Sequence, residues 1–142
     1  MNTTRVLETT RRWIAQTDLT TSDYTDSELL EYMRDAKELM ELRKVTGIET
    51  LTIDPTLETI TPDPTTEQGH MLALKTAYLI LDDEYRSKLF TGSLGMSWRS
   101  GLEQESTITA EKAWRQILDN LHGELEILVL VMRAPTNGTR PQ

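Results

Sequence analysis

Apolar residues recur at helical intervals in three parts of the chain, the first of which is residues 25–46. Four of them, spaced four, three and four positions apart, share one face of a helix: Leu29, Met33, Ala36 and Met40. The residues before this stripe read TDSE, a capping box in which Thr25 and Glu28 each accept a hydrogen bond from the other's backbone N–H. The pattern predicts a helix over 25–46, ended by Gly47.

The second helical stretch is predicted to begin at Asp63 and Pro64 and to run to about Leu89. Aspartate is a good N-cap, and proline is pre-organised for the first helical position. The apolar face of this stretch is broad and contains most of its large side chains: Met71, Leu72, Leu74, Tyr78, Ile80, Leu81 and Tyr85. A face of this width indicates that the helix lies at the centre of the fold.

A third helix is predicted from about Thr109 onward. Its apolar residues are spaced four, three, four, three and four apart, as in a heptad seam: Trp114, Leu118, Leu121, Leu125, Leu128 and Met132. Residues 127–132 are apolar on every side, so this end is expected to be buried or bound to another surface. A strand over 124–133 is the alternative interpretation.

Four other segments lack a strong periodic pattern. Residues 1–23 predict an arm with a short helix over about 4–16, which has too few apolar residues to join the core. Residues 48–61 alternate apolar and threonine positions and predict either a hairpin or an extended loop. The long connection at 90–108 contains large apolar residues and is expected to dock, whereas residues 134–142 predict an extended, flexible tail.

These elements predict a mainly α fold. We expect a small helical bundle of three main helices within residues 24–133, with the hairpin or extended loop between the first two. The N-terminal arm and the C-terminal tail flank this domain. The chain has 142 residues, which fits one domain.

Composition and charge exclude several classes of protein. The chain has no cysteine, which rules out disulfide scaffolds and thiolate chemistry. Its net charge is −8, from 15 Lys and Arg against 23 Asp and Glu, which argues against general DNA binding and against an anionic membrane surface. Only 37% of the residues are apolar, so the core is expected to be thin and completed by a partner.

The sequence offers little for catalysis, metal binding or cofactor binding. Its two histidines, His70 and His122, have no carboxylate or hydroxyl at the spacing of a catalytic triad. The acidic run at 82–84 cannot converge on one ion, because consecutive helical residues point about 100° apart. No nucleotide-binding or hydrolase motif is present. We therefore expect no enzyme activity, no metal and no cofactor.

Acidic residues dominate the stretch from Asp18 to Glu41, which contains eight acids and two bases, Arg34 and Lys37. One interpretation is an ordinary solvated helix face. The other is a negative surface that repels phosphate, past which DNA slides without sticking. The residues predicted to form this acidic face, toward a channel or a neighbouring subunit, are Glu31, Asp35, Glu38 and Glu41.

The order of these elements resembles the adaptor (head–tail connector) family of tailed bacteriophages. The resemblance is carried by the capped acidic helix YTDSELLEYMRDA, the proline-entered helix ITPDPTTEQGHMLALKTAYLILDDEY and the segment MSWRSG, followed by a last helix and a polar tail. It covers roughly residues 24–133. The resemblance implies a mainly helical protein that forms a ring, usually of twelve copies, beneath the portal protein. It also implies contact with the next neck or tail protein and viral DNA that passes through the centre without sequence-specific binding.

The resemblance implies that the protein is located in the neck of the virion, and in the host cytoplasm during assembly. Apolar, aromatic and basic residues of the long connection, the last helix and the tail are predicted to form the portal or subunit interface: Phe90, Met96, Trp98, Arg99, Ile127, Leu130, Val131, Met132, Arg133, Pro135 and Arg140. The competing hypothesis is a small acidic helical regulatory module, of the antitoxin or anti-repressor type, that binds a basic partner. Such a module would be a monomer or a dimer rather than a ring.

Overall fold

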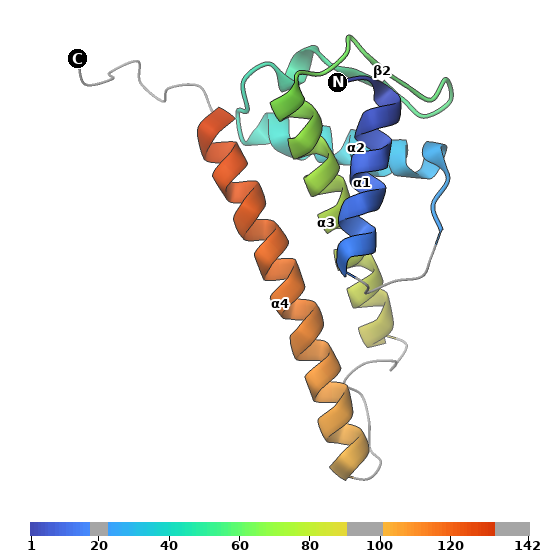
Figure 1. The fold of residues 1–142 in the computed structure, drawn as a ribbon, viewed down its shortest axis with the longest axis vertical. Helices are drawn as coiled ribbons and strands as arrows, with labels where there is room; N and C mark the ends of the chain where they lie inside the picture. The colour runs from blue at the N-terminus through green and yellow to red at the C-terminus, as the bar shows by residue number, and fades with distance from the viewer. Residues whose placement is uncertain (18–22, 91–100, 133–142) are drawn as a thin grey trace, which may run out of the picture.

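Four α-helices and one small antiparallel sheet make up the described part of the protein. The computed structural model describes residues 1–17, 23–90 and 101–132, and side chains at 1–17, 23–87 and 112–132. The helices are α1 (Thr3–Thr17), α2 (Asp26–Leu42), α3 (Thr66–Phe90) and α4 (Gly101–Met132) (Figure 1). The predicted mainly α fold is therefore confirmed, with four helices in this part of the chain rather than three.

Helix α2 begins as the sequence predicts. The Thr25 hydroxyl accepts a hydrogen bond from the Glu28 N–H at 3.2 Å, and the Glu28 carboxylate accepts one from the Thr25 N–H at 2.9 Å. The helix ends at Leu42, four residues before the predicted end. Lys44 adopts a left-handed conformation (φ 58°) and turns the chain out of the helix before Gly47 is reached.

The segment between α2 and α3 contains a hairpin, one of the two predicted alternatives. A short 3₁₀ helix (Ile48–Thr50) leads into β1 (Thr52–Asp54), which pairs antiparallel with β2 (Thr59–Thr61). Ile53 lies opposite Ile60, and both are buried against the helices. The Asp54 carboxylate accepts hydrogen bonds from the N–H groups of residues 56 and 57, which closes the turn.

Helix α3 begins two residues later than predicted, at Thr66. Thr65 is the capping residue: its hydroxyl accepts a hydrogen bond from the Gln68 N–H at 3.2 Å, and the Gln68 side chain accepts one from the Thr65 N–H at 2.9 Å. Asp63 and Pro64 precede the cap. The helix ends at Phe90, close to the predicted Leu89, and its broad apolar face is buried as expected.

Helix α4 begins at Gly101, eight residues before the predicted start, and continues to Met132. The alternative of a strand over 124–133 is therefore wrong. Most of the predicted seam is buried, together with one residue outside it: Trp114, Leu118, Leu121, Leu125 and Val129. Leu128 and Met132 are partly buried at the edge of the core.

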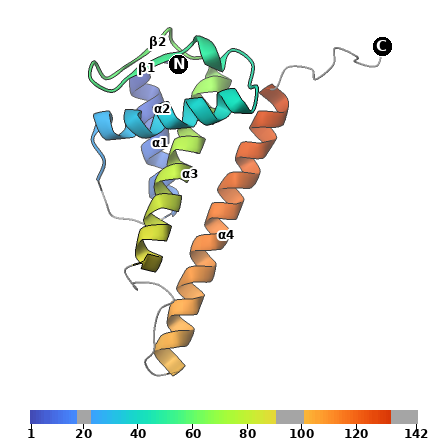
Figure 2. The same cartoon turned by 180° about the vertical axis from the view of Figure 1, so that it is seen from behind.

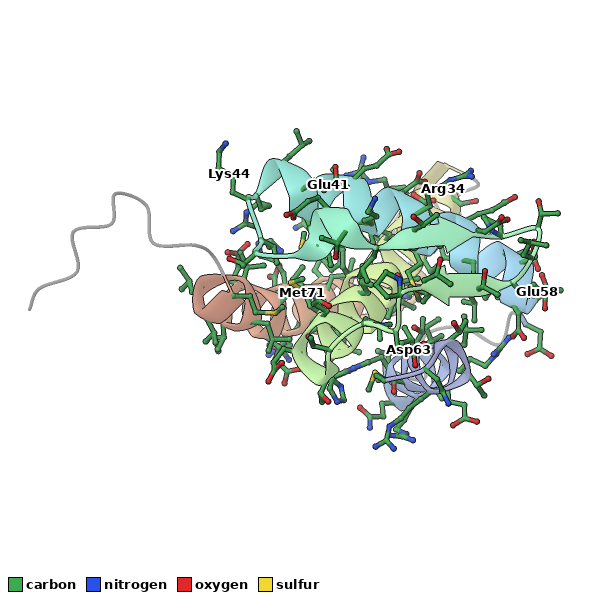
Figure 3. All side chains as sticks on the ribbon, turned by 90° about the horizontal axis from the view of Figure 1, so that it is seen from above. Arg34, Glu41, Lys44, Glu58, Asp63 and Met71 are labelled. Atoms are coloured by element: carbon green, nitrogen blue, oxygen red, sulfur yellow. The ribbon has the colours of Figure 1, made fainter. Side chains whose placement is uncertain are left out.

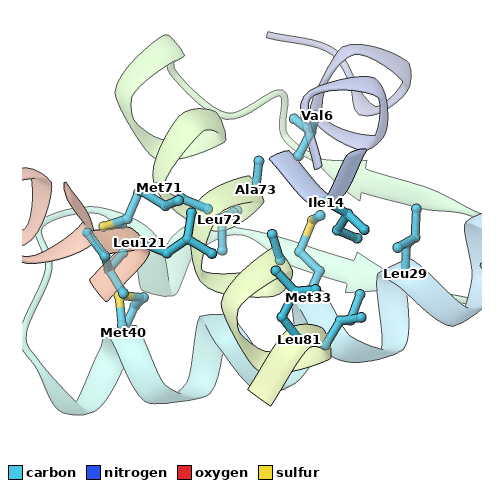
Figure 4. Close-up of a cluster of buried hydrophobic side chains, with 14 of the residues drawn as sticks. Val6, Ile14, Leu29, Met33, Met40, Met71, Leu72, Ala73, Leu81 and Leu121 are labelled. Atoms are coloured by element: carbon cyan, nitrogen blue, oxygen red, sulfur yellow. The ribbon is translucent and has the colours of Figure 1, made fainter. Parts of the chain in front are cut away.

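Helix α1 is part of the core, contrary to the prediction that the N-terminal arm lies outside it. Val6, Leu7 and Ile14 are buried, and so are Thr9 and Thr10. Figure 4 shows Val6 and Ile14 of α1 beside core residues of α2 and α3. The N-terminal segment therefore supplies one wall of the hydrophobic core.

Helix α3 lies between the other helices. From the view of Figure 1, α1 and α4 flank it, and α2 crosses it on the far side. Figure 2 shows α2 from behind, running across α3. The hairpin covers the end of the molecule where α3 begins. The fold therefore has two opposite faces, one between α1 and α4 and one formed by α2.

Candidate functional site

The end of α4 carries three exposed apolar side chains. Ile127, Leu130 and Val131 are 64%, 68% and 73% exposed, whereas Val129 between them is fully buried. The predicted apolar run is therefore divided: one side completes the core and the other faces solvent. We call Ile127, Leu130 and Val131 the α4 apolar end. Met132, also predicted as an interface residue, is only partly buried against the core.

Polar contacts hold the α4 apolar end in a fixed position on α2. Both guanidinium Nη atoms of Arg43, just after α2, donate to the Glu126 carboxylate of α4, each at 2.7 Å. The backbone N–H of Thr46 donates to the Met132 carbonyl at 3.0 Å. A two-point pair between arginine and carboxylate fixes direction as well as distance. The α4 apolar end is therefore presented to solvent on a rigid support.

This pair should make the stability of the fold depend on pH at acid values. The hydrogen bonds from Arg43 hold the pKa of Glu126 below its ordinary value of 4.5. Because the carboxylate pKa is lowered by folding, the pair stabilises the protein above pH 4.5, and this contribution is lost as the pH falls through the lowered value. We expect Glu126→Gln to lower the stability by about 0.5–1 kcal/mol at pH 7. The difference from the unmodified protein should shrink as the pH falls through the lowered pKa of Glu126, as measured by thermal melting.

The matched control for this measurement is Glu41→Gln. Glu41 pairs with Lys37 one turn away on the same helix, at 2.9 Å, and does not join two helices. Its replacement should change the melting temperature only slightly at any pH. Equal effects of the two substitutions at pH 7 would mean that the Arg43–Glu126 pair does not hold α4 to α2.

All four residues of the predicted acidic face are exposed: Glu31, Asp35, Glu38 and Glu41. Three of them lie at helical intervals of four and three positions, and the next position of the same row is Leu42, which is 79% exposed. We call Glu31, Asp35, Glu38 and Leu42 the α2 outer row. Figure 3 shows Arg34 and Glu41 on α2, on the side of α3 away from α1. Whether this face meets DNA or a neighbouring subunit stays a prediction.

An apolar trough lies on the other side of α3, between α1 and α4. One part of it, of about 340 Å³, is lined by Trp13, His70, Leu74, Glu124, Ile127 and Leu128. The adjoining part, of about 240 Å³, is lined by Trp13, Gln16, Thr17, Ile117, Asn120, Leu121 and Glu124. We call both parts together the α1–α4 trough. Because Ile127 belongs to it, the trough is continuous with the α4 apolar end.

The remaining predicted interface residues lie outside the part of the chain whose side chains the structure describes. Phe90 is the last residue of α3, and only its backbone is described. The others fall in segments 91–100 and 133–142: Met96, Trp98, Arg99, Arg133, Pro135 and Arg140. Their roles in an interface stay predictions.

Several ionisable residues of the described part are engaged in structural contacts. His122 lies 3.4 Å from Glu126, and its ring is 5.7 Å from that of Tyr78. Asp82 pairs with Arg86, whereas Asp83 accepts a hydrogen bond from Tyr32 at 3.0 Å. Burial, this bond and nearby carboxylates raise the pKa of Tyr32 to about 12, so its hydroxyl stays protonated.

The described residues form neither a metal-binding group nor a membrane-spanning helix. Among residues 1–17, 23–87 and 112–132, no group of three or more His, Asp or Glu is placed to hold a metal ion. Within the described helices, none is both long and apolar enough to cross a membrane. No protein-family model, curated protein or solved structure matches the chain.

The sequence did not indicate the α1–α4 trough. Trp13 lines both of its parts, and this residue belongs to the helix that was expected to lie outside the core. A tryptophan one position before the buried Ile14 was the available signal, because large aromatic side chains are seldom left in water without a partner.

Proposed function

We propose that this protein is a structural virion protein: an adaptor of the phage neck. In this proposal it assembles as a ring below the portal protein, joins the head to the tail and lets DNA pass through the centre of the ring. The ring would have the twelve copies that the family resemblance implies. The protein would act without a cofactor and without catalysis.

The observation that carries this proposal is the α4 apolar end. Three large apolar side chains within five residues are more than 60% exposed, and the bidentate pair between Arg43 and Glu126 supports the helix behind them. Contiguous exposed apolar groups of this kind mark surfaces that bind another protein. A ring subunit needs at least one such surface, because every copy contacts two neighbours and the portal.

The acidic face of α2 supports the same proposal. Its exposed carboxylates repel phosphate where they face the DNA channel, and they can pair with basic groups where they meet a neighbouring subunit. In the proposed assembly, Arg133, Pro135 and Arg140 belong to a C-terminal segment that docks on the portal. A second segment, which joins α3 to α4, also contacts the portal or a neighbouring subunit in this assembly. It contributes Phe90, Met96, Trp98 and Arg99.

Electron microscopy of the purified protein, alone and mixed with the portal protein encoded with it, tests the proposal. We expect rings with a central channel, and we expect antibody against this protein to label the neck of particles. A protein that stays a monomer or a dimer with the portal present, and is absent from purified particles, would contradict the proposal. That result would favour the regulatory module.

A further inference from the structure

The α1 edge of the α1–α4 trough carries two exposed arginines in one row of the helix, with the exposed Glu8 between them. Arg5 and Arg12 are exposed and lie seven residues apart, so they share one face of α1. Gln16, one turn after Arg12, lines the trough, which places this row along the trough's edge. Arg11 points to the other side of α1, where it pairs with Asp26 at 2.6 Å. Within the described residues, no side-chain partner is present for Arg5 or Arg12.

The opposite wall of the trough, formed by α4, is mostly apolar, includes Asn120 and carries no positive charge among its described lining residues. Along α4 it runs from Ile117 to Ile127 and Leu128, with Glu124 as its only charged lining residue among those described. Ten residues of helix separate Ile117 from Ile127, a length of about 15 Å. The trough therefore offers a largely apolar surface about as long as three turns of helix, with Arg5 and Arg12 on its α1 edge and Glu124 on its α4 side.

The α2 outer row has the complementary character. Glu31 and Glu38 are seven residues apart, about 10.5 Å along the helix, which is the same separation as that of Arg5 and Arg12. Leu42 continues the row, and Leu39 lies beside it, so the acids adjoin exposed apolar side chains. This face lies on the side of α3 opposite to the trough (Figures 1 and 3).

We propose that the α2 outer row of one copy packs into the α1–α4 trough of the next copy. The carboxylates of Glu31 and Glu38 pair with the guanidinium groups of Arg5 and Arg12. Leu39 and Leu42 cover the apolar lining near Leu74 and Leu128. This inference names the subunit contact of the ring and so rests on the proposed function.

The arrangement of the two faces favours a second copy of this chain as the occupant. The trough and the α2 outer row belong to the same molecule, carry oppositely charged pairs at the same spacing (Arg5 and Arg12 against Glu31 and Glu38) and lie on opposite sides of α3. Contacts between two different faces of identical copies are head-to-tail, and they close into a ring when the rotation between copies allows it. A self-complementary dimer would instead use the same pair of faces twice and stop at two copies.

Engineered disulfides test this contact directly, because the chain has no cysteine of its own. Two variants, Arg12→Cys/Glu31→Cys and Arg12→Cys/Glu38→Cys, cover both directions in which the two helices can run past each other. Cysteines whose Cα atoms come within about 7 Å in neighbouring copies can be oxidised to a bridge. In one of the two variants we expect a ladder of dimers, trimers and larger covalent species, both for concentrated protein and for protein on particles. Each single-cysteine variant should stop at the dimer.

The matched control for crosslinking is Arg12→Cys/Thr56→Cys, which moves the second cysteine to the exposed tip of the hairpin. It should give no species larger than a dimer. A ladder in this control equal to that of the test pairs would show non-specific oxidation and overturn the assigned contact. So would a test pair that stops at the dimer, which is the result expected of a symmetric contact.

Charge reversal provides an independent measurement. Arg5→Glu/Arg12→Glu should raise the concentration needed for assembly at least tenfold, and adding Glu31→Lys/Glu38→Lys to the same chain should restore it. Lys112→Glu/Arg115→Glu changes the net charge equally at exposed positions of α4 and should have little effect. Failure of the compensating variant to restore assembly would overturn the contact.

The outcomes separate this inference from the proposed function. If particles contain the protein in their necks but no test pair forms a ladder there, the assigned contact is wrong and the adaptor function stands. If the ladder forms in solution but the protein neither binds the portal nor occurs in particles, the contact stands and the adaptor function is wrong.

Discussion

Replacing Val6 with aspartate should destabilise the protein by about 4 kcal/mol, because the new carboxylate would be buried without a partner. Val6 is fully buried in α1, where it packs into the core shared with α2 and α3. Proteins of this size are stable by only about 5–15 kcal/mol. We therefore expect the melting temperature of Val6→Asp to fall by about 10–15 °C, measured by circular dichroism at 222 nm.

The control for this variant is Thr4→Asp, two residues earlier on the exposed side of α1. It adds the same charge at the first turn of the helix, where a carboxylate is favourable. Its melting temperature should match that of the unmodified protein. If Val6→Asp melts like Thr4→Asp, then α1 is the peripheral arm that the sequence predicts and does not belong to the core.

The contribution of α1 to the core could not be predicted from its apolar content because two of its buried residues are threonines. The hydroxyl of Thr9 donates to the Arg5 carbonyl at 2.8 Å, and that of Thr10 donates to the Val6 carbonyl at 2.9 Å. A threonine that bonds back to the preceding turn satisfies its hydroxyl and turns its methyl group toward the core. A hydropathy pattern counts such residues as polar.

Local capping chemistry was predicted correctly at the start of α2 but not at the start of α3. The TDSE pattern at Thr25 has a single interpretation, and the structure confirms both of its hydrogen bonds. At the start of α3 the sequence predicts Asp63-Pro64, whereas the cap is Thr65, to which the Gln68 side chain bonds back. The end of α2 depends on the left-handed backbone of Lys44, which no residue preference indicates.

Some of the candidate surfaces could be predicted from the sequence, and one could not. The apolar run at 127–132 and the acids at 31–41 are visible in the sequence, because each is a property of one helix. The α1–α4 trough exists only because α1 and α4 lie on either side of α3, which is a property of the tertiary fold. The position of Arg5 and Arg12 at an interface edge is evident only from their place beside that trough.

Replacing Val131 with glutamate should leave the subunit folded and prevent its assembly. Val131 is 73% exposed, and exposed substitutions usually change stability by less than about 0.5 kcal/mol. Within an interface, however, the glutamate would be taken out of water without a partner, at a cost of several kcal/mol in each copy. Ring contacts repeat in every copy, so this cost accumulates around the assembly. We expect normal helix content and melting temperature for Val131→Glu, with rings reduced at least a hundredfold in electron micrographs.

The matched control is Gln116→Glu, which adds the same charge at an exposed polar position of the same helix, about four turns before Val131. Rings should form normally from this variant. An unfolded Val131→Glu protein would mean that the end of α4 is ordinary core. A folded Val131→Glu protein that assembles as well as Gln116→Glu would remove the α4 apolar end from the interface, and the contacts of the proposed ring would then have to lie elsewhere on the subunit.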